Sequence, residues 1–248
     1  MNVLVMNFSG IYEDEPYLSN FPWISCADIH GINCYCTEES ELEIKSRIEK
    51  FSSEGIHIID SGNYHYVTKI WLEKVNQPFD LVYFDFHPDL HEANFGGLLS
   101  CGSWVKEVIE TNRFLNRVIG IGINPLLIDE IPENLRKRVL FLDCIEKLQK
   151  QMEQEQQAVY ISIDKDVLSP KVVKTNWDQG TMQLEELEQM LHVVFQYRRA
   201  IGVDICGEWE NTNCYYENMQ NSAINNEANR RLIQLINDLF QLQMEKEV

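Results

Sequence analysis

The sequence predicts an α/β fold: a three-layer α/β/α sandwich with a mostly parallel central sheet. Two observations lead to this class. Short apolar, β-branched runs alternate with polar stretches of helical character along the chain. Most of these runs are apolar almost throughout, which is typical of parallel strands that helices cover on both faces. No linker rich in Pro, Gly or Ser divides the chain, so we expect a single domain over residues 1–248.

Seven apolar runs are predicted as strands, and right-handed crossovers through the helices between them would make neighbouring strands parallel. In such a sheet, the functional site lies beyond the carboxyl ends of the strands. The predicted strands are residues 3–8, 56–60, 79–85, 117–123, 139–142, 159–164 and 200–205.

Helix signals stand between and after these strands. Residues 41–54 are predicted to form a helix that ends at Gly55, because glycine readily adopts the left-handed conformation that closes many helices. The last stretch of the chain is predicted as a helix with one face packed on the core. The apolar residues of that face are Leu232, Leu235, Ile236, Leu239 and Leu242.

Two further helices carry capping signals. Asp143, followed by Glu146, predicts a capping box for a helix over residues 143–156. Thr181 is expected to cap a helix over residues 184–199, which has acidic residues in its first turn and basic residues in its last.

The chain is strongly acidic, with 21 Lys and Arg against 39 Asp and Glu and a formal net charge of −18. Such a chain repels a phosphate backbone, and no local basic patch is present, so we expect no nucleic-acid partner. No run approaches the ~18 consecutive apolar residues of a membrane span, so we expect no membrane partner. The opening run MNVLVMNF lacks the basic and long apolar regions of a secretion signal.

The chain has seven cysteines, and none of them forms a C-x-x-C pair. An odd number in a chain without a secretion signal predicts reduced thiols and a cytoplasmic location. One cluster near the start leaves two readings open, a zinc site or ordinary buried thiols. That cluster consists of Cys26, Asp28, His30, Cys34 and Cys36.

Metal-binding side chains follow three of the predicted strands, in the runs DSGNYH at 60–65, DFHPD at 85–89 and DKD at 164–166. Carboxylates at the ends of buried strands lose hydration and repel one another, and divalent cations would remove this penalty. Four carboxylates balance two divalent cations, and two imidazoles complete the set. Because the set is rich in oxygen and contains no thiolate, it favours Mn²⁺ over Zn²⁺. The six candidate ligands are His65, Asp85, His87, Asp89, Asp164 and Asp166.

Each motif also has an ordinary structural explanation. An acid after a strand often only caps the next helix, and His65 alone is more often a hydrogen-bonded loop histidine. Their joint occurrence at strand ends of one sheet is what predicts a metal site. His30, His57 and His192 lack ligand spacing and are interpreted as structural.

Residues 62–66, 85–89 and 162–170 resemble the three metal motifs of the ureohydrolase superfamily (arginase, agmatinase and formiminoglutamase), in that family's order. The third run, SIDKDVLSP, matches the pattern S-x-D-x-D-x-x-D-P except that Ser169 replaces the last Asp. The resemblance covers roughly residues 56–210. It implies an arginase/deacetylase-like fold and a hydrolase that acts on the C–N bonds of linear amidines.

The resemblance also implies two Mn²⁺ per chain that share a hydroxide, which attacks a guanidinium or amidinium carbon and expels an amine. Asp89 would orient the hydroxide and handle its proton. The ligands that the resemblance assigns are His65 and Asp89 for one ion, His87 and Asp166 for the other, and Asp85 and Asp164 as bridges between them.

Several positions depart from the family pattern. Tyr64 stands where an acid usually precedes the first ligand histidine, and Cys101 and Gly102 stand where the proton-shuttling histidine is expected. His91 is a candidate catalytic residue that would bind substrate or donate a proton, although an ordinary surface histidine remains the alternative. The glycine-rich loop at 96–104 is expected to line the mouth of the site, with Trp104 as a wall.

The substrate side departs as well. Gly207 occupies the place where arginases have the Glu that binds the guanidinium, three residues after Asp204. A one-residue bulge would bring in Glu208, which is therefore the predicted guanidinium acceptor. Asp204 is expected to contact a metal ligand.

Three functions remain open on these grounds. The leading prediction is a binuclear metal-dependent hydrolase of a guanidino or amidino C–N bond, acting on a small cationic compound or an arginine-containing peptide. The alternatives are an amide hydrolase of the deacetylase type and an arginase-fold protein that binds metal without turnover. The resemblance also allows a homo-oligomer.

Overall fold

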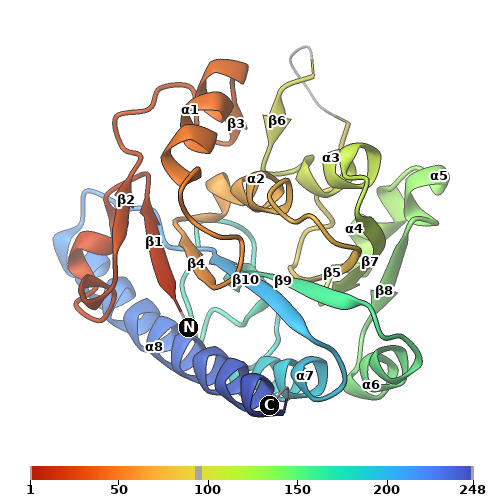
Figure 1. The fold of residues 1–248 in the computed structure, drawn as a ribbon. Helices are drawn as coiled ribbons and strands as arrows, with labels where there is room; N and C mark the ends of the chain where they lie inside the picture. Colours follow the sequence, from red (N-terminus) through yellow and green to blue (C-terminus); the bar gives the residue numbers. More distant parts are fainter. Residues whose placement is uncertain (1, 93–96, 247–248) are drawn as a thin grey trace.

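An eight-stranded sheet forms the centre of the computed structural model, which describes residues 2–92 and 97–246 (Figure 1). All seven pairs of neighbouring strands are parallel. In sheet order the strands are β2 (Trp23–Ser25), β1 (Val3–Asn7), β4 (Ile56–Ile59), β10 (Ala200–Cys206), β9 (Ala158–Asp164), β5 (Phe79–Phe84), β7 (Leu115–Ile121) and β8 (Val139–Leu142).

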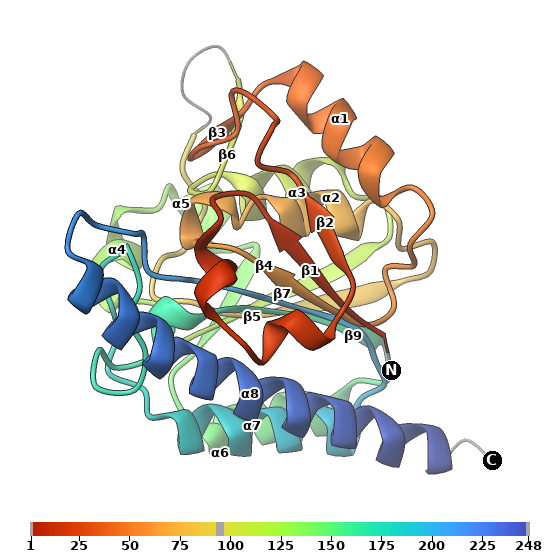
Figure 2. The same cartoon turned by 90° about the vertical axis from the view of Figure 1, so that its left-hand side faces the viewer.

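Helices cover both faces of this sheet, which confirms the predicted three-layer α/β/α sandwich (Figures 1 and 2). One layer contains α1 (Glu38–Ile48), α2 (Val67–Leu72) and α3 (Trp104–Thr111). The other contains α6 (Ile145–Gln154), α7 (Leu184–Tyr197) and α8 (Tyr215–Lys246). The short helices α4 (Pro125–Glu130) and α5 (Glu133–Arg136) connect β7 to β8.

Short elements complete the fold. An antiparallel ribbon of β3 (Tyr35–Cys36) and β6 (Leu99–Ser100) stands beside the main sheet. Four 3-10 helices lie in the connections, namely η1 (Ile11–Asp14), η2 (Leu18–Asn20), η3 (Gly62–Tyr64) and η4 (Lys165–Val167).

The central strands are buried along their full length, as their apolar sequences predict. Two apolar cores result, one on each face of the sheet. The first packs residues such as Leu187 of α7 and Ile236 of α8 against the sheet. The second packs residues such as Ile44 of α1 and Trp71 of α2 against the other face. Burial on both faces explains why the strands read as continuous apolar runs.

The predicted strands all exist, with ends that differ by at most two residues. The short strands β2, β3 and β6 were missed, because two or three residues carry no periodicity. The first predicted helix ends at Ile48 instead of continuing to Gly55. Gly55 has a positive φ of 136° and precedes β4, where an added Cβ would lie 2.7 Å from the carbonyl oxygen of Asn2.

The predicted caps were wrong. The helix α6 begins after Cys144, and the Asp143 carboxylate pairs with Lys147 instead of capping the backbone. The helix α7 is capped by Gln183, in a capping box with Glu186, and not by Thr181.

On α8, one residue of the predicted core-packing face does not belong to it, because Leu242 is 52% exposed.

Among the described residues, no helix combines the length and the apolar character that crossing a bilayer requires.

One buried ion pair ties the end of α7 to the sheet. The Arg198 guanidinium donates a hydrogen bond of 2.8 Å from Nη2 to Oδ2 of Asp80, and both side chains are fully buried. Asn116 Nδ2 donates to the other oxygen of the same carboxylate. Removing one partner of such a pair leaves an uncompensated charge in the core.

We therefore expect Arg198→Ala to lower the free energy of unfolding by about 3–5 kcal/mol, because Asp80 loses its counter-charge. Chemical denaturation followed by circular dichroism measures this. Arg230→Ala is the control, because the Arg230 pair with Glu227 is on the surface and should leave stability nearly unchanged. Equal losses in the two variants would contradict the role given to the buried pair.

Candidate metal centre

The carboxyl ends of β4, β5 and β9 meet at one pocket, as the strand order requires. The pocket is a cavity of about 290 Å³. All six predicted ligands lie on its wall, namely His65, Asp85, His87, Asp89, Asp164 and Asp166. The sequence prediction that these side chains converge therefore agrees with the geometry, while their binding of metal stays a prediction.

His65 lies at the centre of one group of ligands. Its Nδ1 is 3.2 Å from a carboxylate oxygen of Asp85, 3.2 Å from one of Asp89 and 3.4 Å from one of Asp164. Its Nε2 shares a hydrogen bond of 2.8 Å with the Ser162 hydroxyl. Although Nδ1 is buried among these oxygens, it forms no hydrogen bond, and the same holds for Oδ2 of Asp85. Buried atoms of this kind are costly unless something outside the protein binds them.

A second group forms around His87. Its Nδ1 lies 2.8 Å from Oδ2 of Asp166 and 3.7 Å from Oδ1 of Asp85. Backbone N–H groups hold the carboxylates in place, because Phe86 donates to Asp166 and His87 donates to Asp85. Asp85 belongs to both groups, since one of its oxygens faces each histidine.

The electrostatics of the pocket reflect dense burial of like charges. Burial, followed by repulsion from Asp89 and Asp164, raises the pKa of Asp85. Burial and the charge of Asp85 raise the pKa of Asp166 to about 7. Burial lowers the pKa of His87, but its hydrogen bonds to Asp166 and Asp85 outweigh this and raise it to about 11. Raised pKa values of this kind are expected where buried carboxylates crowd together without cations between them.

Asp89 is held by the residue that was predicted to line the mouth. Trp104 Nε1 donates a hydrogen bond of 2.6 Å to Oδ2 of Asp89, and the indole is fully buried beside His65. The prediction that Trp104 forms a wall of the pocket mouth was therefore wrong. Trp177, which sequence reasoning missed, forms that wall instead. It is 40% exposed and makes an edge contact with His87.

The glycine-rich loop does reach the pocket. Ser100, Cys101 and Gly102 line it, while Gly96 lies outside the described residues. His91 also lines the pocket, and its backbone N–H donates to the carbonyl of Gly102. Cys101 stands opposite Cys34 across the β3–β6 ribbon, where the two backbones share a hydrogen bond of 2.9 Å.

Glu208, the predicted guanidinium acceptor, faces away from the pocket. It is fully buried, and its carboxylate pairs with Lys165 and accepts hydrogen bonds from Asn225 and Asn229. Gly207 explains why no acid can stand one position earlier. It has a positive φ of 92°, and an added Cβ would lie 2.4 Å from an oxygen of Asp164. We therefore assign Glu208 to the interior of the fold and not to substrate binding.

Other sequence interpretations are settled by the contacts. Asp204 was expected to contact a metal ligand, but its carboxylate accepts from Tyr160 and pairs with His57 at 2.8 Å. His57 stacks on Trp71 in the core, in agreement with a structural role. Tyr64 stacks on the ring of Phe8, away from the ligand groups.

The cluster near the start of the chain does not form a metal site within residues 2–92 and 97–246. Its acid, Asp28, forms a salt bridge with Arg47 on the surface, and His30 is exposed. Cys26 is buried in the apolar core beneath α1, which corresponds to the reading of ordinary buried thiols.

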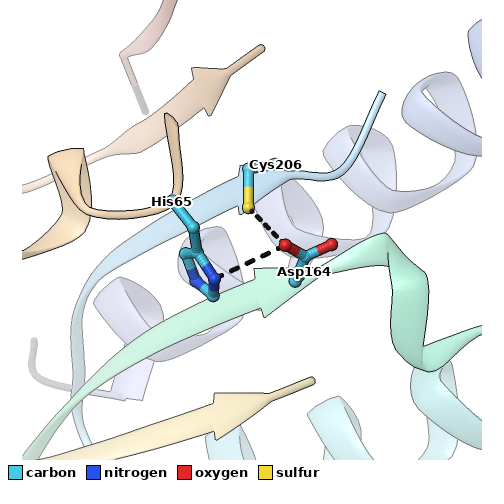
Figure 3. Close-up of side chains that lie close together, drawn as sticks. All are labelled: His65, Asp164 and Cys206. Carbon is cyan, nitrogen blue, oxygen red and sulfur yellow. Dashed lines mark hydrogen bonds and ion pairs between the residues drawn. The ribbon is translucent and has the colours of Figure 1, made fainter. Parts of the chain in front are cut away.

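A residue outside the predicted set lies against the ligands. Cys206, the last residue of β10, pairs in register with Asp164 and lies within 4.8 Å of the His65 ligand atom (Figure 3). Its only sequence signal was its position two residues after Asp204 at a predicted strand end.

The Trp104 hydrogen bond generates a first test of this site. Trp104→Phe keeps a large ring but leaves Asp89 without its donor, so we expect metal affinity to fall about 10- to 100-fold. Isothermal titration with Mn²⁺ measures this. Trp71→Phe is the matched control, because its buried indole N–H has no partner and its loss should leave affinity unchanged. Unchanged affinity in Trp104→Phe would contradict the positioning role.

The raised carboxyl pKa values generate a second test. In the metal-free protein, a carboxyl whose pKa is raised by folding destabilises the folded state once it ionises. The free energy of unfolding therefore falls as the pH rises from the ordinary carboxyl pKa near 4 through about 7, the value for Asp166. Metal binding must displace their protons. We therefore expect the rise in melting temperature caused by Mn²⁺ to be larger at about pH 7.5 than at about pH 5.5, relative to samples with chelator. An equal rise at both pH values would contradict this electrostatic picture.

Comparisons with known proteins identify the family of this chain. The family model described as "Arginase family" matches residues 7–208. An uncharacterised protein of Thermotoga maritima is 30% identical over 209 residues, covering 84% of this chain and 80% of that protein.

Solved structures share the fold. The agmatine ureohydrolase of Thermoplasma volcanium matches with a TM-score of 0.69 and 15% identity, over 99% of this chain and 91% of the other. The proclavaminate amidino hydrolase from Streptomyces clavuligerus matches with a TM-score of 0.66 and 14% identity, over 98% and 91%. Together with the family model, these findings show that the chain belongs to the arginase family, within the ureohydrolase superfamily.

Proposed function

We propose that this protein is a binuclear metal-dependent hydrolase that cleaves a C–N bond of a guanidino or amidino compound. One observation carries the proposal: six side chains from three separate segments converge on one pocket, around His65 and His87, with Asp85 between the two histidines. Four carboxylates and two imidazoles match the charge and donor preference of two divalent cations of the Mn²⁺ type.

The residues of the pocket have distinct tasks in this proposal. Two bound cations would act as Lewis acids and would lower the pKa of a water molecule, so that a nucleophile is available at neutral pH. Asp89, fixed by Trp104, orients the nucleophile and accepts its proton. His91 lies at the rim, where it contacts the substrate or delivers a proton to the departing amine.

The pocket limits the substrate. Its cavity of about 290 Å³ suits a small molecule or a single side chain. Because Gly207 and Glu208 offer no carboxylate to the guanidinium, the cationic end is bound differently from the family pattern. Glu92 lines the pocket, and although one of its carboxylate oxygens pairs with Lys106 at 3.1 Å, the side chain is 73% exposed, which makes it a candidate to bind that end. We propose a small cationic guanidino or amidino compound, or the side chain of an arginine-containing peptide, as the substrate.

One alternative has support of its own. Cys101 and Gly102 replace the expected proton-shuttling histidine, and Gly207 replaces the expected acid. These changes favour an arginase-fold protein that binds metal without turnover as the second candidate. The deacetylase type has less support, because a single-metal site would leave His65, Asp89 and Asp166 without a task.

The decisive experiment combines elemental analysis with product detection. Protein loaded with Mn²⁺ is incubated separately with arginine, agmatine, formiminoglutamate and an arginine-containing peptide, and urea, formamide and free amine are assayed. Product from any of these supports the hydrolase. Full metal occupancy without product from any of them supports the binding protein, and one zinc ion per chain supports the deacetylase type.

A matched pair of variants tests the site itself. His87→Asn removes an imidazole that faces two carboxylates, so we expect turnover to fall at least ~100-fold and bound metal to decrease. His192→Asn, on the exposed side of α7, should change neither. Turnover that survives in His87→Asn would place the reaction elsewhere.

A further inference from the structure

Cys206 is a buried thiol that the proposed function does not use. It ends β10 directly beside Asp164 on β9, and only 1% of it is exposed. Its Sγ lies 3.2 Å from Oδ2 of Asp164, and both atoms lie within 4.8 Å of a ring nitrogen of His65. Figure 3 shows the three side chains pointing toward one another from three different segments.

The environment of His65 indicates that this group is completed by an ion. Its outer nitrogen, Nε2, is already bonded to Ser162, which fixes the ring with Nδ1 facing the carboxylates. That Nδ1 is fully buried and has no hydrogen-bond partner. A histidine that is held by one nitrogen and directs the other toward several carboxylates has the usual arrangement of a metal ligand.

The distances are those of atoms that share one ion. Two atoms bonded to the same ion at about 2.0–2.3 Å lie roughly 2.8–3.7 Å apart. The separations of 3.2 Å between the Cys206 sulfur and Asp164, and of 3.4 Å between Asp164 and His65, both fall in this range. The thiol thus lies close enough to Asp164 and His65 to share an ion with them.

We propose that Cys206 is an additional ligand, through its sulfur, of an ion that His65 and Asp164 would hold. This inference rests on the proposed binuclear site. When the ion binds, the S–H bond breaks, the sulfur keeps the electron pair and donates it to the ion, and the proton leaves to solvent. A thiolate is a soft ligand, so it shifts the preference of this position from Mn²⁺ toward Zn²⁺, Co²⁺ or Fe²⁺.

This proposal revises the metal expected from the sequence. Manganese was favoured because the set of six contains no thiolate, and the register of β10 against β9 brings one to it. The six original ligands remain in place, so the binuclear arrangement is unchanged. What changes is which metal each position prefers, because Cys206 groups with His65 and Asp164 and not with His87 and Asp166.

Cobalt is the probe that tests the proposal, because a thiolate bound to Co²⁺ gives an intense charge-transfer absorption in the near ultraviolet. The full-length protein is titrated with Co²⁺, and bound metal is counted by elemental analysis. We expect the band in the wild type and its loss in Cys206→Ser, with cobalt still bound. Competition between Zn²⁺ and Mn²⁺ should show the preference for Zn²⁺ falling about tenfold or more in that variant.

The matched control addresses the thiols on the wall of the pocket. Cys34 and Cys101 both line it, so the double variant Cys34→Ser with Cys101→Ser must keep the band if Cys206 is the source. X-ray absorption of the zinc-loaded wild type needs no variant, and should show a Zn–S distance of about 2.3 Å.

The outcomes separate the two proposals. Cobalt bound at full occupancy without a thiolate band, a band that depends on Cys34 and Cys101, or zinc surrounded only by nitrogen and oxygen would each overturn the role of Cys206. Each of these results leaves the binuclear hydrolase standing. Wild-type protein that binds no divalent ion at all overturns the proposed function, and the sulfur ligand with it.

Discussion

The pocket depends on one constraint, which is that four carboxylates are buried side by side at the end of a parallel sheet. Each follows a strand that is dry on both faces, so each loses hydration and raises its neighbours' pKa values. Backbone N–H groups and the Trp104 indole fix individual oxygens, but they do not cancel four charges. His65 and His87 offset carboxylate charge only when they are protonated. A protonated ring nitrogen cannot bind a metal ion at the same time. Divalent cations would bind the buried atoms that lack hydrogen bonds and would offset the excess charge, which supports the proposed metal centre.

The sequence predicts those features that neighbouring residues determine, and it fails for features that depend on contacts with other side chains. The carboxyl ends of β5 and β9 were predictable, because each changes from a continuous apolar run to an aspartate at one residue. Caps were not, since they depend on competition between partners: the Asp143 carboxylate pairs with Lys147 at the surface instead of turning to the backbone. Trp104 was misplaced for a similar reason. Its apolar ring suits a pocket wall, but its N–H finds a buried acceptor in Asp89, and burying it satisfies both groups.

Cys206 and Trp177 lay beyond sequence reasoning for different physical reasons. Cys206 meets Asp164 only because β10 and β9 pair in one particular register, and spacing along the chain does not specify registers between strands that are far apart in sequence. Trp177 stands in an irregular segment without periodicity, and its place at the pocket follows from a hydrogen bond between its indole N–H and Asn63. The positions of Cys206 and Trp177 therefore depend on tertiary contacts, which a local sequence pattern does not specify.

The departures from the family pattern leave the six predicted ligands unchanged, and two of them, Cys101 and Gly102, line the pocket. Gly207 is a third departure, at the place where an acid was expected to face the substrate. At position 207 the difference is enforced by the backbone, since a Cβ there would collide with Asp164. Glu208 is in turn held by Lys165, so moving it into the pocket would leave a buried cation unpaired. If the proposed function holds, the substrate would contact the remaining wall of the pocket, which consists of the β3–β6 ribbon with its flanking residues, Gly62, His91, Glu92 and Trp177.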